Sequence, residues 1–170
     1  MSKEQDYAPG LWHRLMAAGP GPGPGGGRGG AAERLTLAQL KASVARDLEN
    51  LLNTRVALAP SLLEGLPLCS ESIINYGMLD FAALSLASSD DRKRICTSLQ
   101  HAIACFEPRL HNVEAQLLVD ARATRQLDFV ITGTLRVLAT PERIRFKAML
   151  QPSNLRYAVS QLSGAAREGA

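Results

Sequence analysis

Residues 88–119 read SSDDRKRICTSLQHAIACFEPRLHNVEAQLLV, and within this stretch the spacing of the apolar residues changes from three or four to two. The first part predicts a helix, because Ser88 and Asp91 form a capping pair and the apolar residues that follow share one helical face. Pro108 ends this helix, since proline disfavours helical geometry at the residue before it. From Val113 onwards, alternation of apolar and polar residues predicts a strand. The stretch therefore predicts a long helix joined to a strand by a tight corner.

The rest of the chain extends this pattern in both directions. Apolar residues at helical spacing predict a long helix from Leu37 to Arg55 with Thr36 as its N-cap, and a short helix over 71–76 that ends at Gly77. Three further segments alternate with period two and predict strands: 127–137, 143–150 and 155–160. Helices followed by strands indicate an α+β fold, in which two long helices and a short one pack on one face of a four-stranded, mainly antiparallel sheet.

A low-complexity run divides the chain. Residues 19–30 read GPGPGPGGGRGG and hold eight of the 14 glycines, a composition that cannot form a packed core. Trp12 lies before this run, either in a frayed tail or, as we expect, as the anchor of a short helix that docks on a partner. The sequence predicts four parts: an amphipathic segment, 1–18; a flexible linker, 19–34; a folded domain, 35–160; and a polar tail, 161–170.

Charge and cysteine content limit the class of protein. The net charge is +3, which is too small to indicate nucleic-acid binding by itself. The three cysteines form no motif and no apolar run is long enough to span a membrane, so we expect a cytoplasmic protein without membrane insertion. Period two places Arg143 and Arg145 on one face of their strand, away from the aromatic residues that a nucleic-acid platform needs. We interpret this basic face as protein-facing or solvated.

The sequence contains no strong catalytic motif. The three histidines lack metal-ligand spacing, and the glycine run lacks the strand that a dinucleotide site requires, so we expect no metal or cofactor. Glu107 could serve as the general acid of a glycoside hydrolase, with Asp80 or Glu114 as its mate. Nothing in the sequence places these carboxylates together, and a structural role for Glu107 is the simpler interpretation.

Three segments resemble one family. Residues 43–55, SVARDLENLLNTR, are similar to the R-D-L-E-x-L-L-N-T-R helix of TssE, the small baseplate subunit of type VI secretion systems. Residues 72–81, SIINYGMLDF, resemble its S-x-x-N-Y-G-L-P-D-F connector, and residues 106–110, FEPRL, match its E-P-R signature. This signature is shared with phage baseplate wedge proteins historically called lysozyme-related. The chain is thus identified as a member of that family over about residues 37–160.

The resemblance implies a non-catalytic subunit of a membrane-docked baseplate wedge, beside TssF and TssG and with TssK as a further candidate partner. It also implies a sheet from which contractile sheath subunits begin to assemble; the alternative is a peptidoglycan-cleaving, lysozyme-like enzyme. The residues that we expect to bind partners are Glu107, Pro108, Arg109, Trp12, Arg143, Arg145 and Tyr157. The expected structural motif residues are Arg46, Asp47, Asn53, Arg55, Tyr76, Gly77, Asp80 and Phe81. Glu107 and Arg109 could instead only brace the corner between helix and strand.

Overall fold

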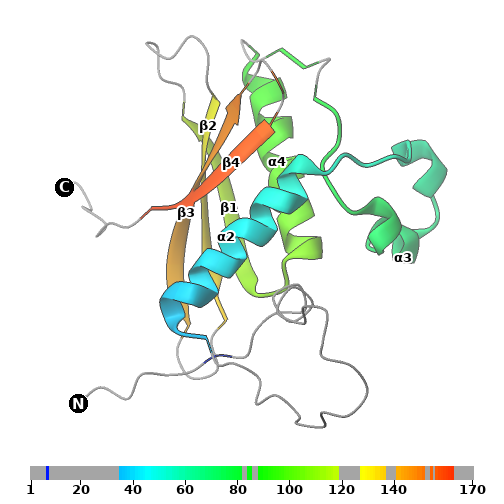
Figure 1. Cartoon of the computed structure of the whole chain (residues 1–170). Coiled ribbons are helices and arrows are strands. Elements are labelled where there is room, and N and C mark those ends of the chain that lie inside the picture. Colours follow the sequence, from blue (N-terminus) through cyan, green and yellow to red (C-terminus); the bar gives the residue numbers. More distant parts are fainter. Residues whose placement is uncertain are drawn as a thin grey trace, which may run out of the picture. The chain divides into compact units, whose positions relative to one another are not determined.

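The computed structural model describes residue 7 and residues 35–81, 84–85, 88–118, 127–136, 141–151, 154 and 156–162. The helical elements come first: α2 (Leu37–Asn53), the 3-10 turn η1 (Pro60–Leu63), α3 (Pro67–Ser70), the 3-10 turn η2 (Ile73–Asn75) and α4 (Ser89–Phe106). Four strands follow: β1 (Leu110–Leu118), β2 (Leu127–Leu135), β3 (Glu142–Gln151) and β4 (Arg156–Gln161). This order, visible in Figure 1, confirms the predicted α+β fold.

The predicted short helix over 71–76 differs in detail from the structure. Two shorter turns, α3 and η2, replace it, and the Ser72 hydroxyl caps the second by accepting from the Ile74 amide. Ser72 itself has an extended backbone, so the helix cannot run through it. Figure 1 shows α3 beside α4 and away from the sheet.

The chain forms two compact units, 1–44 and 45–170, and their boundary lies inside α2. In the first unit, Tyr7 and Leu35 exchange two backbone hydrogen bonds of 2.8 Å. Thr36 caps α2 as predicted, since its hydroxyl accepts from the Gln39 amide at 3.3 Å while the Gln39 side chain accepts from the Thr36 amide at 2.8 Å. Trp12, the linker and most of the polar tail lie outside the described residues and stay predictions.

In the second unit, the sheet is antiparallel throughout, with strand order β1-β2-β3-β4. Phe129 and Ile131 of β2 and Phe146 of β3 are fully buried on one face, in agreement with the predicted alternation. Helix α4 packs along β1 and buries Ile95, Leu99, Ala102 and Ile103. The Ser88 hydroxyl accepts from the Asp91 amide at 3.3 Å, so the predicted cap is present. The helix and the sheet thus share one apolar layer.

Side chains of α2 close part of the β4 edge. The side-chain amide of Asn53 donates to the Tyr157 carbonyl at 2.8 Å, and its oxygen accepts from the Tyr157 amide at 2.9 Å. The Glu49 carboxylate accepts from the Val159 amide at 2.8 Å. In an antiparallel sheet, alternate residues of an edge strand direct both backbone groups outwards. Asn53 therefore takes the place that a further strand would occupy at Tyr157.

Replacing Asn53 with alanine should lower the free energy of unfolding by about 1–3 kcal/mol, because the Tyr157 amide and carbonyl lose their partner. Hydrogen exchange at the Tyr157 amide should accelerate together with this loss. Asn50→Ala is the matched control, since Asn50 is an exposed asparagine of the same helix. A Tyr157 amide that stays equally protected in the Asn53 variant would contradict this reading of the edge.

Candidate functional site

The corner between α4 and β1 is fixed by its backbone. The Glu107 amide donates to the Ile103 carbonyl at 2.9 Å and still belongs to the helix, while the Leu110 amide donates to the Glu107 carbonyl at 3.0 Å. The Arg109 carbonyl accepts from the Arg136 amide at 2.9 Å, which joins the corner to the end of β2. Helix α4 thus ends where Pro108 predicts, and the flanking side chains have defined directions.

Glu107, Arg109 and Asp47 form a charged network at this corner. Arg109 donates from Nε to Glu107 Oε1 at 2.6 Å and from Nη2 to Glu107 Oε2, a two-point pair typical of strong arginine–carboxylate contacts. The same Nη2 donates to Asp47 Oδ2 of α2 at 2.5 Å. Glu107 is only 4% exposed, whereas the Arg109 side chain is 24% exposed. Arg109 therefore joins two carboxylates from different elements, and Arg109 and Asp47 are the partly exposed members of the network.

The two carboxylates determine the charge state of Arg109. Burial alone would lower its pKa, but the hydrogen bonds and charges of Glu107 and Asp47 outweigh burial and raise the pKa above its ordinary value. The guanidinium stays charged. Among the described residues, its buried Nη1 has no hydrogen-bond acceptor.

Tyr76 brings a third segment to the same place. Its ring lies edge-on to Phe106, with 5.2 Å between ring centroids. Burial raises the pKa of Tyr76, and the negative charges of Asp47 and Glu107 raise it further, so the phenol lies close to the network. The corner thus joins α2, the segment after η2, and the end of α4.

Gly77 holds this segment against α2. The Met78 amide donates to the Thr54 carbonyl at 2.8 Å and the Val56 amide donates to the Met78 carbonyl at 3.1 Å. Gly77 has φ +127°, and a Cβ at this position would lie 2.7 Å from the Thr54 carbonyl oxygen. Position 77 requires glycine because the two backbone segments approach too closely to leave room for a Cβ.

The model of the baseplate wedge protein gp25 family matches residues 38–140, which is more than half of the chain. The chain belongs to this family. The match runs from α2 to just beyond β2 and includes every residue of the charged corner. A comparison with curated proteins finds no match. Within the part of the chain that the structure describes, no helix is both long and apolar enough to cross a membrane.

Membership of the baseplate wedge family gives the corner a structural context. Proteins of this family are structural components of phage-tail-like baseplates, so their contacts are with other baseplate components. The described residues contain no cluster of three or more His, Cys, Asp or Glu side chains that could hold a metal ion. What the corner offers is a fixed, charged, partly exposed arginine, which suits recognition of a protein surface.

Five of the site and motif residues expected from the sequence lie together at the corner: Asp47, Tyr76, Glu107, Pro108 and Arg109. Of the other motif residues, Asn53 caps β4, and Arg55 donates from Nη1 to the Leu52 carbonyl at 2.9 Å after the helix ends. Arg46 and Asp80 are exposed and Phe81 is half-buried. The motif residues thus serve several separate contacts.

Tyr157 needs a correction. The sequence places it among partner-binding residues, but its side chain is only 3% exposed and its ring lies 6.2 Å from that of Phe129. Burial raises the pKa of Tyr157 to about 12, as expected for a phenol enclosed in the core. Its ring is unavailable to a partner because it is buried in the core near Phe129. Arg143 and Arg145, by contrast, are exposed on β3.

Sequence reasoning identifies Asp47 as a motif residue but misses that it binds Arg109. The two residues are 62 positions apart, and no local pattern links them. The only signal that could link them is that each belongs to a segment resembling the same family. The role of Phe106 as the ring beneath Tyr76 is likewise missed, because its place in the apolar stripe of α4 already accounts for it.

Proposed function

We propose that this chain is a TssE-like, non-catalytic subunit of a type VI secretion baseplate wedge. In this proposal it docks beside TssF and TssG, with TssK as a further contact, on the cytoplasmic side of a membrane-docked baseplate. The observation that carries the proposal is the match to the baseplate wedge family across the complete Glu107–Arg109–Asp47 network. The similarity of three separate motifs to TssE supports the type VI system over other baseplates.

The corner supports a double role. Glu107 and Asp47 hold Arg109 in place, so the brace is built within the chain. The Arg109 side chain is 24% exposed, and Pro108 beside it is exposed. A pre-positioned guanidinium loses little side-chain entropy when it binds, which favours a partner that supplies an acceptor. We infer that the brace serves to present Arg109 and Pro108 to a neighbouring wedge subunit.

The sheet supports sheath assembly through its β1 edge. At β4, an added strand would have to displace Asn53 from Tyr157 and Glu49 from Val159. At β1, the group beside the Leu117 backbone is the Cys96 thiol, a weaker hydrogen-bond partner than a carboxylate or an amide. Strand addition extends a sheet at an edge whose backbone groups can still pair. We therefore place the proposed contact with sheath subunits at β1. Arg143 and Arg145 are exposed two strands away, on β3, and are available to acidic groups.

The lysozyme-like alternative is less well supported by the geometry. Both carboxylate oxygens of Glu107 bind Arg109, and the residue is 4% exposed, so neither oxygen faces a substrate cleft. A turbidity assay on purified cell walls separates the two functions. We expect no clearing by the wild-type protein; clearing that is abolished by Glu107→Gln would establish the enzymatic function instead.

The structural function is tested in host cells that express a fluorescent sheath subunit. Deleting this chain should abolish assembled sheaths, and re-expressing it should restore them, because the proposed subunit starts sheath assembly. Re-expression of Arg94→Ala, which alters an exposed residue of α4 outside the proposed contacts, should restore them. Sheaths that assemble at normal frequency in the deletion strain would refute the proposal.

A further inference from the structure

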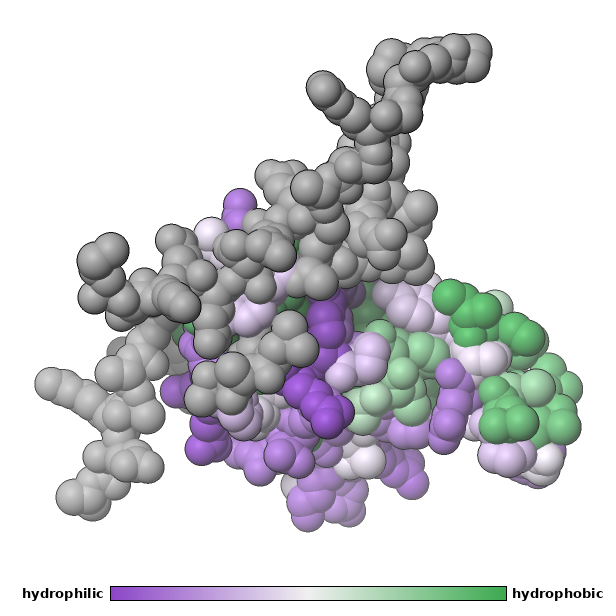
Figure 2. All heavy atoms as spheres, turned by 90° about the horizontal axis from the view of Figure 1, so that it is seen from below, coloured by the Kyte–Doolittle hydropathy of each residue, from purple (hydrophilic) through white to green (hydrophobic). Residues whose placement is uncertain are grey.

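The segment that joins α2 to α4 in the chain exposes an apolar surface. We call residues 60–79 the apolar lobe; they include η1, α3 and η2. Six large hydrophobic side chains of the lobe are exposed: Leu62, Leu66, Leu68, Ile73, Ile74 and Leu79. Leu68 and Ile73 are 85% and 84% exposed. Figure 2 shows these hydrophobic residues gathered over the part of the molecule that Figure 1 labels α3. Contiguous exposed apolar surface of this kind marks an interaction site.

The lobe presents these side chains on a defined scaffold. Its C-terminal end is tied to α2 through the hydrogen bonds of Met78 to Thr54 and Val56. Inside it, the Asn75 side chain donates to the Ser70 carbonyl at 2.8 Å, and the Ser72 hydroxyl donates to the Cys69 carbonyl at 2.8 Å. Polar groups thus hold the backbone while the apolar side chains point outwards. These apolar side chains form the surface of the lobe and do not take part in its internal packing.

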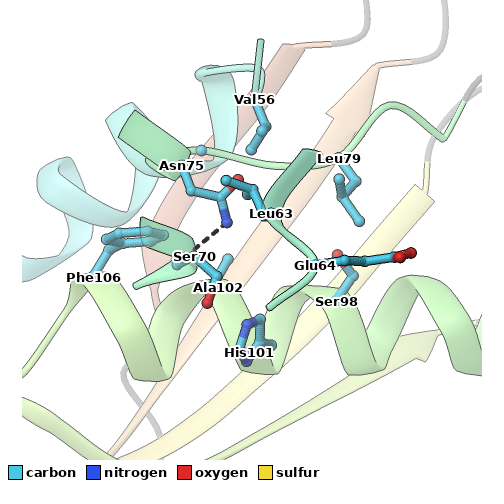
Figure 3. Close-up of a pocket in the computed structure, with 11 residues that line it drawn as sticks. Val56, Leu63, Glu64, Ser70, Asn75, Leu79, Ser98, His101, Ala102 and Phe106 are labelled. Atoms are coloured by element: carbon cyan, nitrogen blue, oxygen red, sulfur yellow. Dashed lines mark hydrogen bonds between the residues drawn. The ribbon is translucent and has the colours of Figure 1, made fainter. Parts of the chain in front are cut away.

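A pocket of about 320 Å³ lies between the lobe and α4. Leu63 and Leu79 from the lobe side face Ala102 and Phe106 of α4 across it, with His101 and Glu64 at its rim (Figure 3). The lining is mostly apolar, and the volume suits one large side chain. An anchor of this type entering a pocket is the usual centre of a binding surface.

The charge around the lobe selects the kind of partner. Residues 56–81 contain three carboxylates, Glu64, Glu71 and Asp80, and no Lys, Arg or His. Glu64 lines the pocket. Burial raises the pKa of the Cys105 thiol of α4, and the charge of Glu71 raises it further, which places Glu71 near α4. An apolar surface with acidic groups at its rim matches an amphipathic helix with Lys or Arg beside its apolar stripe. The same acidic groups disfavour an anionic membrane surface.

We propose that the apolar lobe and its pocket bind a basic amphipathic helix of another protein. A Leu or Phe of that helix occupies the pocket, its neighbours at helical spacing cover Leu68 and Ile73, and its basic residues face Glu64 and Glu71. The inference goes beyond the proposed function, because it concerns a surface that adjoins the Arg109 corner but does not use Arg109, and it does not depend on which wedge subunit supplies the helix.

The test uses the full chain and a fluorescein-labelled peptide of about 15 residues, four helical turns, with Leu and a central Phe on one face and Lys on the flanks. Fluorescence anisotropy should show saturable binding. Leu68→Ser with Ile73→Ser should weaken it at least about tenfold, or ~1.4 kcal/mol. Glu64→Gln with Glu71→Gln should weaken it and reduce its salt dependence. A peptide with Glu in place of Lys should bind more weakly than the basic peptide.

The matched control is Leu118→Ser with Leu162→Ser, since these leucines are exposed at 48% and 36% but lie outside the lobe. This control should bind the basic peptide like the wild type, and thermal unfolding should show that both double variants are folded. Equal binding by the lobe variant, or equal binding of the acidic peptide, would overturn the proposal. Concentration-dependent dimers that Leu68→Ser abolishes would assign the lobe to a second copy, and binding to anionic vesicles through the lobe would assign it to a membrane; either result overturns the proposal as well.

Discussion

Replacing Arg109 with alanine should lower the free energy of unfolding by about 3 kcal/mol. The substitution removes the partner of Glu107, which is 4% exposed, and that of Asp47, so two carboxylates remain near each other without a cation. Removing one member of a buried ion pair typically costs about 3–5 kcal/mol, and the 24% exposure of Arg109 places the expected loss at the lower end. Urea unfolding of the two proteins measures this difference directly.

Two further variants separate geometry from charge. Arg109→Lys keeps the charge but cannot make the two-point pair with Glu107, so its loss should lie between wild type and alanine. Arg145→Ala, which removes an exposed arginine of β3, should change the free energy of unfolding by less than about 0.5 kcal/mol. Similar small losses in the Arg109 and Arg145 variants would contradict a structural network.

Replacing Gly77 with alanine should destabilise the protein by about 2–4 kcal/mol. A Cβ would lie 2.7 Å from the Thr54 carbonyl oxygen, and that oxygen accepts the Met78 amide, so neither segment can move without losing a hydrogen bond. The backbone of Gly77 also has φ +127°, a conformation that alanine rarely adopts. Because Tyr76 is the neighbouring residue, its ring should move away from Phe106, and the near-ultraviolet circular dichroism of the aromatic residues should change.

Gly65 provides the matched control. It has φ +78°, but a Cβ added there would meet no atom within 4 Å, so Gly65→Ala should cost only the left-handed backbone penalty of about 1 kcal/mol. The difference between the two variants isolates the close approach to Thr54. Equal losses at Gly65 and Gly77 would show that backbone conformation alone accounts for the effect and that the contact with α2 is unimportant.

The regular elements are the part of the fold that sequence patterns predict well. Ser88 and Thr36 cap their helices as predicted, because capping depends on residues three positions apart. The strands follow from alternation, which a half-buried sheet imposes on β2 and β3. The lobe is different, since turns of three or four residues show no period, and their helix type depends on local bonds such as that of Ser72.

The site is less predictable than the fold for a physical reason. Its parts depend on contacts between residues far apart in the chain, such as Arg109 with Asp47 and Asn53 with Tyr157. Sequence similarity to TssE selects most of these residues without stating their partners. Tyr157 is expected among the partner-binding residues, but alternation in its strand places the ring on the apolar face, where the structure buries it.

Co-expression of this chain with TssF and TssG from the same host shows whether it is a structural wedge subunit. The quantity to measure is the mass of the purified complex. A stable complex that contains all three proteins is the predicted result, and Arg109→Lys, which keeps the charge, should weaken it more than Arg145→Ala does. A folded chain that elutes alone while TssF and TssG assemble without it would contradict the proposed function.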